Sequence, residues 1–114
     1  MKVDIGDAAV ELDASGAVAT VSGSLRLSNV AEYAPVRAFL DRAAEQAGEA
    51  LTVDLRGLAY LNSAGITTLS LFVLARKKVG RPRLTIRGST VVAWQDRSLK
   101  NFGKLWNLVD VAFG

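Results

Sequence analysis

Apolar residues alternate with polar ones over the first quarter of the chain, a period typical of half-buried β-strands. The apolar positions are Ala9, Val10 and Leu12, followed by Ala17, Val18, Ala19 and Val21. Residues 13–16, Asp-Ala-Ser-Gly, separate the two groups and tolerate turn dihedrals. The pattern therefore predicts a β-hairpin, and a short extended piece over residues 24–27 follows it.

Apolar residues spaced three and four apart predict a first amphipathic helix over about residues 34–47. Pro35 lies near its start and Gly48 directly after its end, where each residue type is favoured. Ser28 or Asn29 is expected to cap it. The apolar stripe of this helix consists of Val36, Phe39, Leu40 and Ala43.

Two further helices alternate with short β-prone segments. The second helix is predicted over residues 63–79, ending at Gly80-Arg81-Pro82, and the third over residues 90–105. The apolar members of the third are Val91, Val92, Trp94, Leu99, Phe102 and Leu105. Strands are predicted over residues 51–55, 83–87 and 108–113, while residues 56–61 carry the chain back across the sheet edge. This order predicts an α/β fold in a single domain, residues 1–114, with a mixed β-sheet and helices packed mainly on one face.

The amino-acid composition excludes several classes of function. The chain has no cysteine and no histidine, which removes disulfides, thiolate ligands, and the usual serine–histidine arrangement of hydrolases. Asp54, Asp96 and Asp110 are not spaced to pair with another catalytic group. We therefore expect a non-enzymatic protein with no catalytic residues, no metal site and no cofactor.

The net charge of +3 is mildly basic. The densest basic cluster is Arg76, Lys77, Lys78, Arg81 and Arg83. We interpret it as complementing the C-terminus of the second helix, with contact to acidic protein, anionic lipid or nucleic acid as the alternative. No aromatic residues interleave the cluster, so nucleic-acid binding is not predicted.

Two features bear on localisation. The N-terminal residues carry charges where a signal peptide needs an apolar stretch. The longest apolar run, residues 69–75, is far short of the roughly 20 residues of a membrane span. We expect a cytoplasmic protein without membrane insertion.

The most informative stretch is residues 51–69, where a strand and a polar turn lead into the second helix. Asn62, Ser63, Ala64 and Gly65 lie at the N-terminus of that helix, where free N–H groups and the macrodipole favour negative charge. Ala64 and Gly65 are small and are expected to leave the backbone open to a phosphate or a partner surface. Phosphorylation of Ser63 would add about −1.5 to −2 charge there. The alternative is that Ser63 is a helix N-cap and nothing more.

This stretch resembles the signature of STAS domains of the anti-sigma-factor antagonist type, and residues 21–25 are similar to the family's Gly-x-Leu segment. The resemblance implies that a partner anti-sigma factor, a serine kinase-like ATPase, phosphorylates Ser63, and that a phosphatase resets it. Two positions depart from the family pattern, because Asn62 and Arg26 replace the usual acids. The chain therefore resembles a divergent bacterial STAS-like regulator in which Arg26 is suited to pair with a phosphoserine.

The apolar residues of the second helix spread beyond one stripe, so Leu71 with Phe72 or Leu74 is expected to be exposed, as a partner or homodimer surface. The alternative is that the first and third helices cover them. The predicted partner-binding residues are Arg26, Asn62, Ser63, Ala64, Gly65, Thr67, Thr68 and Leu71. Two functions remain open: a phosphorylation switch at Ser63, or a constitutive, unphosphorylated subunit of a stressosome-like scaffold or lipid-transport ATPase complex.

Overall fold

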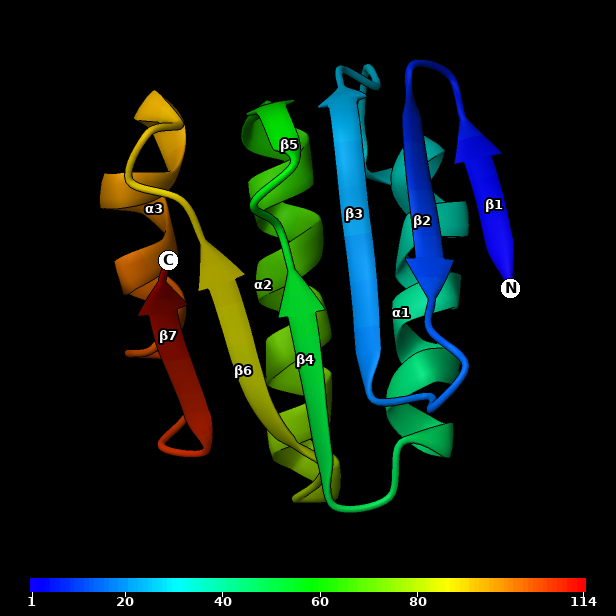
Figure 1. Ribbon diagram of the computed structural model, residues 1–114, viewed down its shortest axis with the longest axis vertical. Helices are drawn as coiled ribbons and strands as arrows, with labels where there is room; N and C mark the ends of the chain where they lie inside the picture. Colours follow the sequence, from blue (N-terminus) through cyan, green and yellow to red (C-terminus); the bar gives the residue numbers. More distant parts are fainter.

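The computed structural model describes residues 1–114, which form one seven-stranded sheet with three α-helices and a 3₁₀ turn (Figure 1). The elements in chain order are β1 (Lys2–Ile5), β2 (Ala8–Leu12), β3 (Val18–Leu25), η1 (Val30–Tyr33), α1 (Ala34–Gln46), β4 (Ala50–Asp54), β5 (Leu58–Leu61), α2 (Ser63–Val79), β6 (Arg83–Gly88), α3 (Ala93–Phe102) and β7 (Val109–Phe113). The strand order is β1-β2-β3-β4-β6-β7, and β5 pairs with β3.

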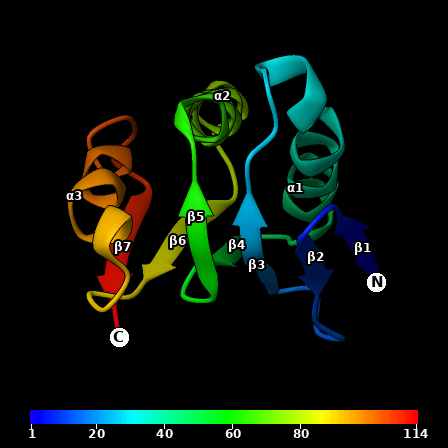
Figure 2. The same ribbon diagram turned by 90° about the horizontal axis from the view of Figure 1, so that it is seen from above.

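The sheet is mixed. β1, β2 and β3 pair antiparallel, whereas β3, β4, β6 and β7 run parallel. All three α-helices lie on one face of the sheet (Figure 2). The fold class predicted from the sequence is therefore confirmed.

The core lies between the sheet and the helices because every second strand residue points toward the helices. Val10, Val21, Val53 and Ile86 are buried on that face, each at 4% exposure or less. The helices contribute the predicted stripe of α1 together with Leu69, Phe72 and Val73 of α2. The parallel strands all end at the same edge of the sheet, from which α2 begins (Figure 1).

The helix signals were accurate for α2, which begins at Ser63 and ends at Gly80 with φ of +87°. Asn29 does act as a cap, but its side chain accepts a bond from the Glu32 N–H at the start of η1. Pro35 lies in the first turn of α1, as expected. No helix is sufficiently long and apolar to cross a membrane.

Three element predictions were wrong. β1 was missed because it has only four residues, too few for the alternation of Val3 and Ile5 with charged residues to indicate a strand. Residues 58–61 form the strand β5, whereas the sequence suggested a connection. The third helix begins at Ala93 and ends at Phe102, since residues 89–92 form a turn in which the Val92 N–H donates to the Ser89 carbonyl. Val91 is consequently 90% exposed and belongs to no apolar stripe.

Candidate functional site

Asn62 is the N-cap of α2, so the alternative interpretation of Ser63 as a helix N-cap was wrong. The Asn62 Oδ1 accepts a hydrogen bond from the Gly65 N–H at 3.1 Å. The same oxygen accepts from the Tyr33 hydroxyl at 2.6 Å, and the Asn62 Nδ2 donates to the Leu27 carbonyl at 2.8 Å. One amide therefore joins the segment after β3, the turn η1 and the start of α2.

Tyr33 reaches this amide from the interior, with 1% of its surface exposed. Burial raises the pKa of the Tyr33 phenol above its ordinary value, and a backbone hydrogen bond at Leu27 opposes part of that shift. The hydroxyl is thus held in its neutral, hydrogen-donating form. No sequence signal pointed to Tyr33 or Leu27, since both lie far from Asn62 along the chain.

Ser63 is the first residue of α2 and its side chain is exposed. The capping bonds at this end of the helix belong to Asn62, so the Ser63 hydroxyl is not engaged in holding the turn. A hydroxyl presented at a fixed helix N-terminus can accept a phosphate without dismantling the cap.

Gly65 and Thr68 do not lie on the surface predicted from the sequence. A Cβ atom at Gly65 would clash with Leu61 Cδ1 and lie 3.0 Å from the Tyr33 hydroxyl, so the small size of Gly65 serves internal packing and does not expose backbone. Thr68 is 2% exposed, and its hydroxyl donates to the Ala64 carbonyl. Ala64 is half-buried and Thr67 exposed.

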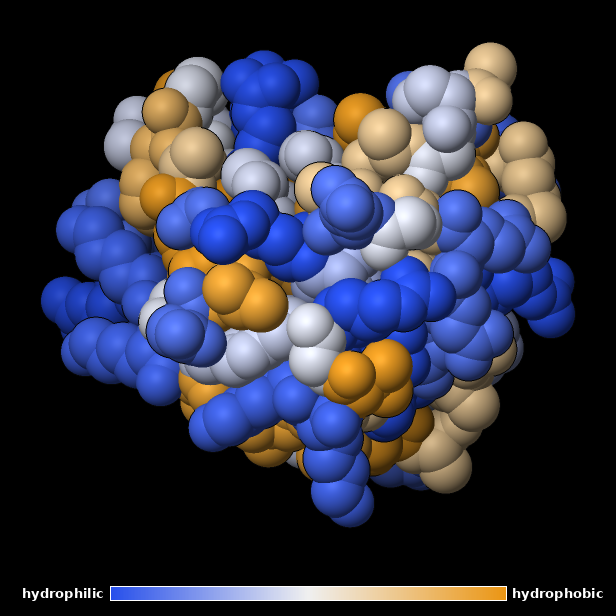
Figure 3. Space-filling model, turned by 90° about the horizontal axis from the view of Figure 1, so that it is seen from below, coloured by the Kyte–Doolittle hydropathy of each residue, from blue (hydrophilic) through white to orange (hydrophobic).

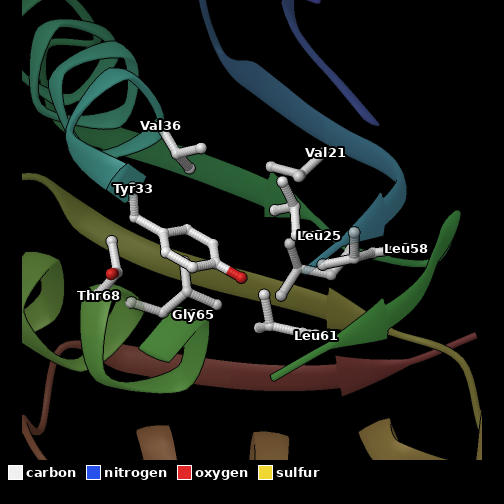
Figure 4. A pocket seen from close by; sticks show the side chains of 10 residues that line it. Val21, Leu25, Tyr33, Val36, Leu58, Leu61, Gly65 and Thr68 are labelled. Carbon is white, nitrogen blue, oxygen red and sulfur yellow. The ribbon is translucent and has the colours of Figure 1, made fainter. Parts of the chain in front are cut away.

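An apolar cavity of about 10 Å³ lies beneath this turn, between Gly65, Tyr33 and the ends of β3 and β5 (Figure 4). Such a volume is at the lower limit for one water molecule. In Figure 4 the Tyr33 side chain extends from η1 toward Gly65 at the start of α2. The cavity is therefore a packing feature beneath the site and has no room for a ligand.

Arg26 is exposed directly after β3, with its guanidinium carbon 4.8 Å from the centre of the Tyr60 ring. Leu25 pairs with Leu61 in the β3–β5 register, which places Arg26 beside the turn that contains Ser63. Its observed neighbour is an aromatic face, whose attraction for a cation is modest at an exposed site. Arg26 also borders a shallow cleft of about 160 Å³ between the β1–β2 turn and the end of β3.

The outer face of α2 exposes Leu71 at 40% and Leu74 at 42%, whereas Phe72 is 2% exposed. Phe72 therefore belongs to the buried core, whereas the two leucines are accessible. Leu71, Leu74 and Thr67 share one side of the helix, because residues three and four apart lie on the same face.

The basic cluster is distributed over several partners. Arg81 donates to the Gly48 and Glu45 carbonyls at the C-terminus of α1, so the interpretation that it complements α2 was wrong for this residue. Arg83 lies 3.6 Å from Asp110, and Arg76 is 7% exposed. Lys77 and Lys78 remain exposed on the last turn of α2, where a helix favours cations, and Figure 3 shows this end of the molecule covered largely by hydrophilic side chains.

Each aspartate singled out in the sequence lies in its own ion pair, Asp54 with Arg56, Asp96 with Lys100, and Asp110 with Arg83. The Arg56 side chain holds the pKa of Asp54 below its ordinary value. A further buried group, Gln95 at 0% exposure, donates to the Leu55 and Leu58 carbonyls and accepts from the Ser89 N–H. It fixes the loop between β4 and β5, and no residue pattern predicted it.

No protein-family model matches the chain, and no curated protein matches it. Two solved structures share its fold. One is a chain in the crystal structure of the diguanylate cyclase SiaD in complex with its activator SiaC from Pseudomonas aeruginosa, with 17% identity, a TM-score of 0.71, and coverage of 100% of this chain and 99% of that one. The other is SiaC of Pseudomonas aeruginosa, with 20% identity, a TM-score of 0.70, and coverage of 100% and 96%. At these identities the likeness establishes the fold alone.

Proposed function

We propose that this protein is a non-enzymatic regulator of the STAS-like, anti-sigma-factor-antagonist type, which binds a partner protein through the N-terminal half of α2. Phosphorylation of Ser63 controls that binding. The observation that carries the proposal is the exposed Ser63 hydroxyl on a helix N-terminus that Asn62 already caps. The switch can therefore change charge without changing the fold.

The docking surface consists of Arg26, Ser63, Thr67, Leu71 and Leu74, all exposed. Its apolar part supplies affinity, since exposed leucines on one helix face suit a protein partner. Its polar part supplies regulation, since a phosphate on Ser63 adds negative charge where the unmodified surface has the Arg26 cation. Asn62, Ala64, Gly65 and Thr68 support this surface from beneath or beside it.

The structural likeness to SiaC supports the general class. SiaC is described as the activator of SiaD, so a chain of this fold acts in that complex by binding an enzyme. We propose that this protein also acts by binding an enzyme. Its partner is then a signalling enzyme, or a kinase-like or phosphatase regulator. The STAS resemblance favours a kinase-type anti-sigma factor among them.

The second candidate is a constitutive subunit of a stressosome-like scaffold or lipid-transport ATPase complex. Asn62 favours it specifically, because its amide donates to the Leu27 carbonyl in a way that the family's usual acid cannot when ionised. In this alternative the surface of α2 is an assembly contact and Ser63 stays unmodified.

Intact-mass and phosphopeptide analysis of the protein from its native host separates the two. A phosphate on Ser63, lost in Ser63→Ala and retained in Thr67→Ala, supports the switch. Binding to the co-purified partner is then compared for wild type, Ser63→Asp and Ala14→Asp, which adds the same charge in the distant hairpin. Loss of binding in Ser63→Asp alone is expected, whereas an unmodified Ser63 with partners still bound would establish the constitutive subunit.

A further inference from the structure

The sheet face opposite the helices is uncovered (Figure 2). Sheets built from parallel strands are usually covered on both faces, yet β3, β4, β6 and β7 are parallel here and all three helices pack on one side. The residues that point to the free face alternate with the core residues. They are Lys2, Asp4, Ala9, Glu11, Val18, Thr20, Ser22, Ala50, Thr52, Asp54, Arg83, Thr85, Arg87, Asp110 and Ala112.

One row of these residues crosses the sheet in register. Glu11 on β2 lies beside Thr20 on β3, Thr20 lies beside Asp54 on β4, and Asp54 lies beside Arg87 on β6. Glu11 and Arg87 therefore lie on opposite sides of the line that runs between β3 and β4, at equal distances from it. Thr20 and Asp54 are the two residues nearest that line, and the Asp54 carboxylate forms an ion pair with Arg56.

From this row we infer that the free sheet face binds a second copy of this chain. A two-fold axis parallel to the strands, between β3 and β4, brings Glu11 of each copy opposite Arg87 of the other. The same rotation brings Thr20 opposite the Asp54–Arg56 pair. An interface of this symmetry must be self-complementary. The row meets this requirement, because the contact of Glu11 with Arg87 and the contact of Thr20 with the Asp54–Arg56 pair each occur once on either side of the axis.

The small residues of the face permit close approach. Thr20, Thr52 and Thr85 are half-buried and follow one another on β3, β4 and β6. The spacing of strands and residues gives a contact of roughly 400–500 Å² per copy, below the roughly 800 Å² of a standard stable interface. The dimer is consequently a weak one that forms at high concentration, and it leaves the outer face of α2 free.

Sedimentation equilibrium over about 1 μM to 1 mM, at low salt, tests the interface. Glu11→Lys and Arg87→Glu are each expected to weaken dimerisation at least about tenfold, because each places like charges opposite one another. An equimolar mixture of these two variants is expected to dimerise within about threefold of wild type, since both contacts of the mixed dimer are then attractive. Arg97→Glu on α3 is the matched charge control and is expected to change nothing.

A wild type that stays monomeric to about 1 mM overturns the inference, as does a mixture that associates no better than either variant. Dimerisation that is abolished by Leu71→Glu and unaffected by Arg87→Glu also overturns it and assigns association to α2. If Arg87→Glu does not fold, Thr52→Lys replaces it, because a charge beside the axis weakens the same interface. Circular dichroism of each variant establishes that it is folded before association is measured.

Discussion

The hydroxyl of Tyr33 donates a hydrogen bond to the side-chain oxygen of Asn62 at 2.6 Å, across 29 positions of sequence. The bond fixes the N-cap of α2 to a buried ring of η1, and the same amide donates to the Leu27 carbonyl. The turn that presents Ser63 is therefore held from two sides. A preorganised turn favours binding because less conformational freedom is lost when a partner docks.

Replacing Asn62 is expected to destabilise the protein in a graded way. Asn62→Ala removes three hydrogen bonds, one of which is the helix cap, and we expect this to lower the free energy of unfolding by about 2–4 kcal/mol. Asn62→Asp keeps the acceptor but loses the donor to Leu27, so the cost is about 1–3 kcal/mol, offset by up to about 1 kcal/mol from the favourable charge at the helix N-terminus. Urea unfolding measures both, and an Asn62→Asp protein more stable than wild type would contradict a contribution from the bond to Leu27.

Tyr33 makes stability depend on pH at the alkaline end. Burial raises the pKa of its phenol above 10.0, so the neutral form is favoured in the folded state. The associated stability is complete below the unfolded pKa, near 10, and is lost as the pH rises through the folded pKa. We expect the free energy of unfolding to fall above about pH 10 in wild type and in Tyr60→Phe, whose tyrosine is exposed. Tyr33→Phe should lose about 0.5–1.5 kcal/mol at neutral pH and show a smaller alkaline decrease; an unchanged decrease would place the titration elsewhere.

Local signals in the sequence were sufficient for α2 and not for the parts that pair at long range. The start and end of α2 follow from a polar turn and from Gly80, which lie next to the helix they limit. β5 was missed because its partner is β3, more than thirty residues away, and four residues give little periodicity. The site was predicted in part for the same reason. Ser63 and Asn62 were identified from the turn itself, but the burial of Thr68 depends on how α2 packs against η1 and the sheet.

Substitutions of Ser63 are expected to change the free energy of unfolding very little and the affinity for the partner strongly. Its hydroxyl caps nothing, so Ser63→Ala and Ser63→Asp should change the free energy of unfolding by no more than about 0.5 kcal/mol. The negative charge of an aspartate at this first helical position also interacts favourably with the helix dipole. Thermal unfolding measured beside partner affinity separates the two effects. A loss of stability well above this range in Ser63→Ala would contradict the assignment of the cap to Asn62.

Gln95 offers a test of whether the β4–β5 loop supports the site from a distance. Its side chain is fully buried and makes three hydrogen bonds to the backbone of Leu55, Leu58 and Ser89. Gln95→Leu keeps the volume and leaves the buried Ser89 N–H without its partner, at a cost of about 1–3 kcal/mol. The Leu55 carbonyl still accepts from the Leu58 N–H, and the Leu58 carbonyl still accepts from the Trp94 Nε1. We expect a large drop in the unfolding midpoint, measured by urea titration.

The matched control for Gln95→Leu is Arg97→Leu, an exposed position on the same helix that should stay within about 0.5 kcal/mol of wild type. Because Leu58 begins β5, and β5 leads directly into Asn62, a folded Gln95→Leu protein should also expose the amides of residues 58–62 to faster hydrogen exchange. Exchange that accelerates only around residue 95 would show that the loop holds its shape without this side chain, and that α3 does not support the turn at Ser63.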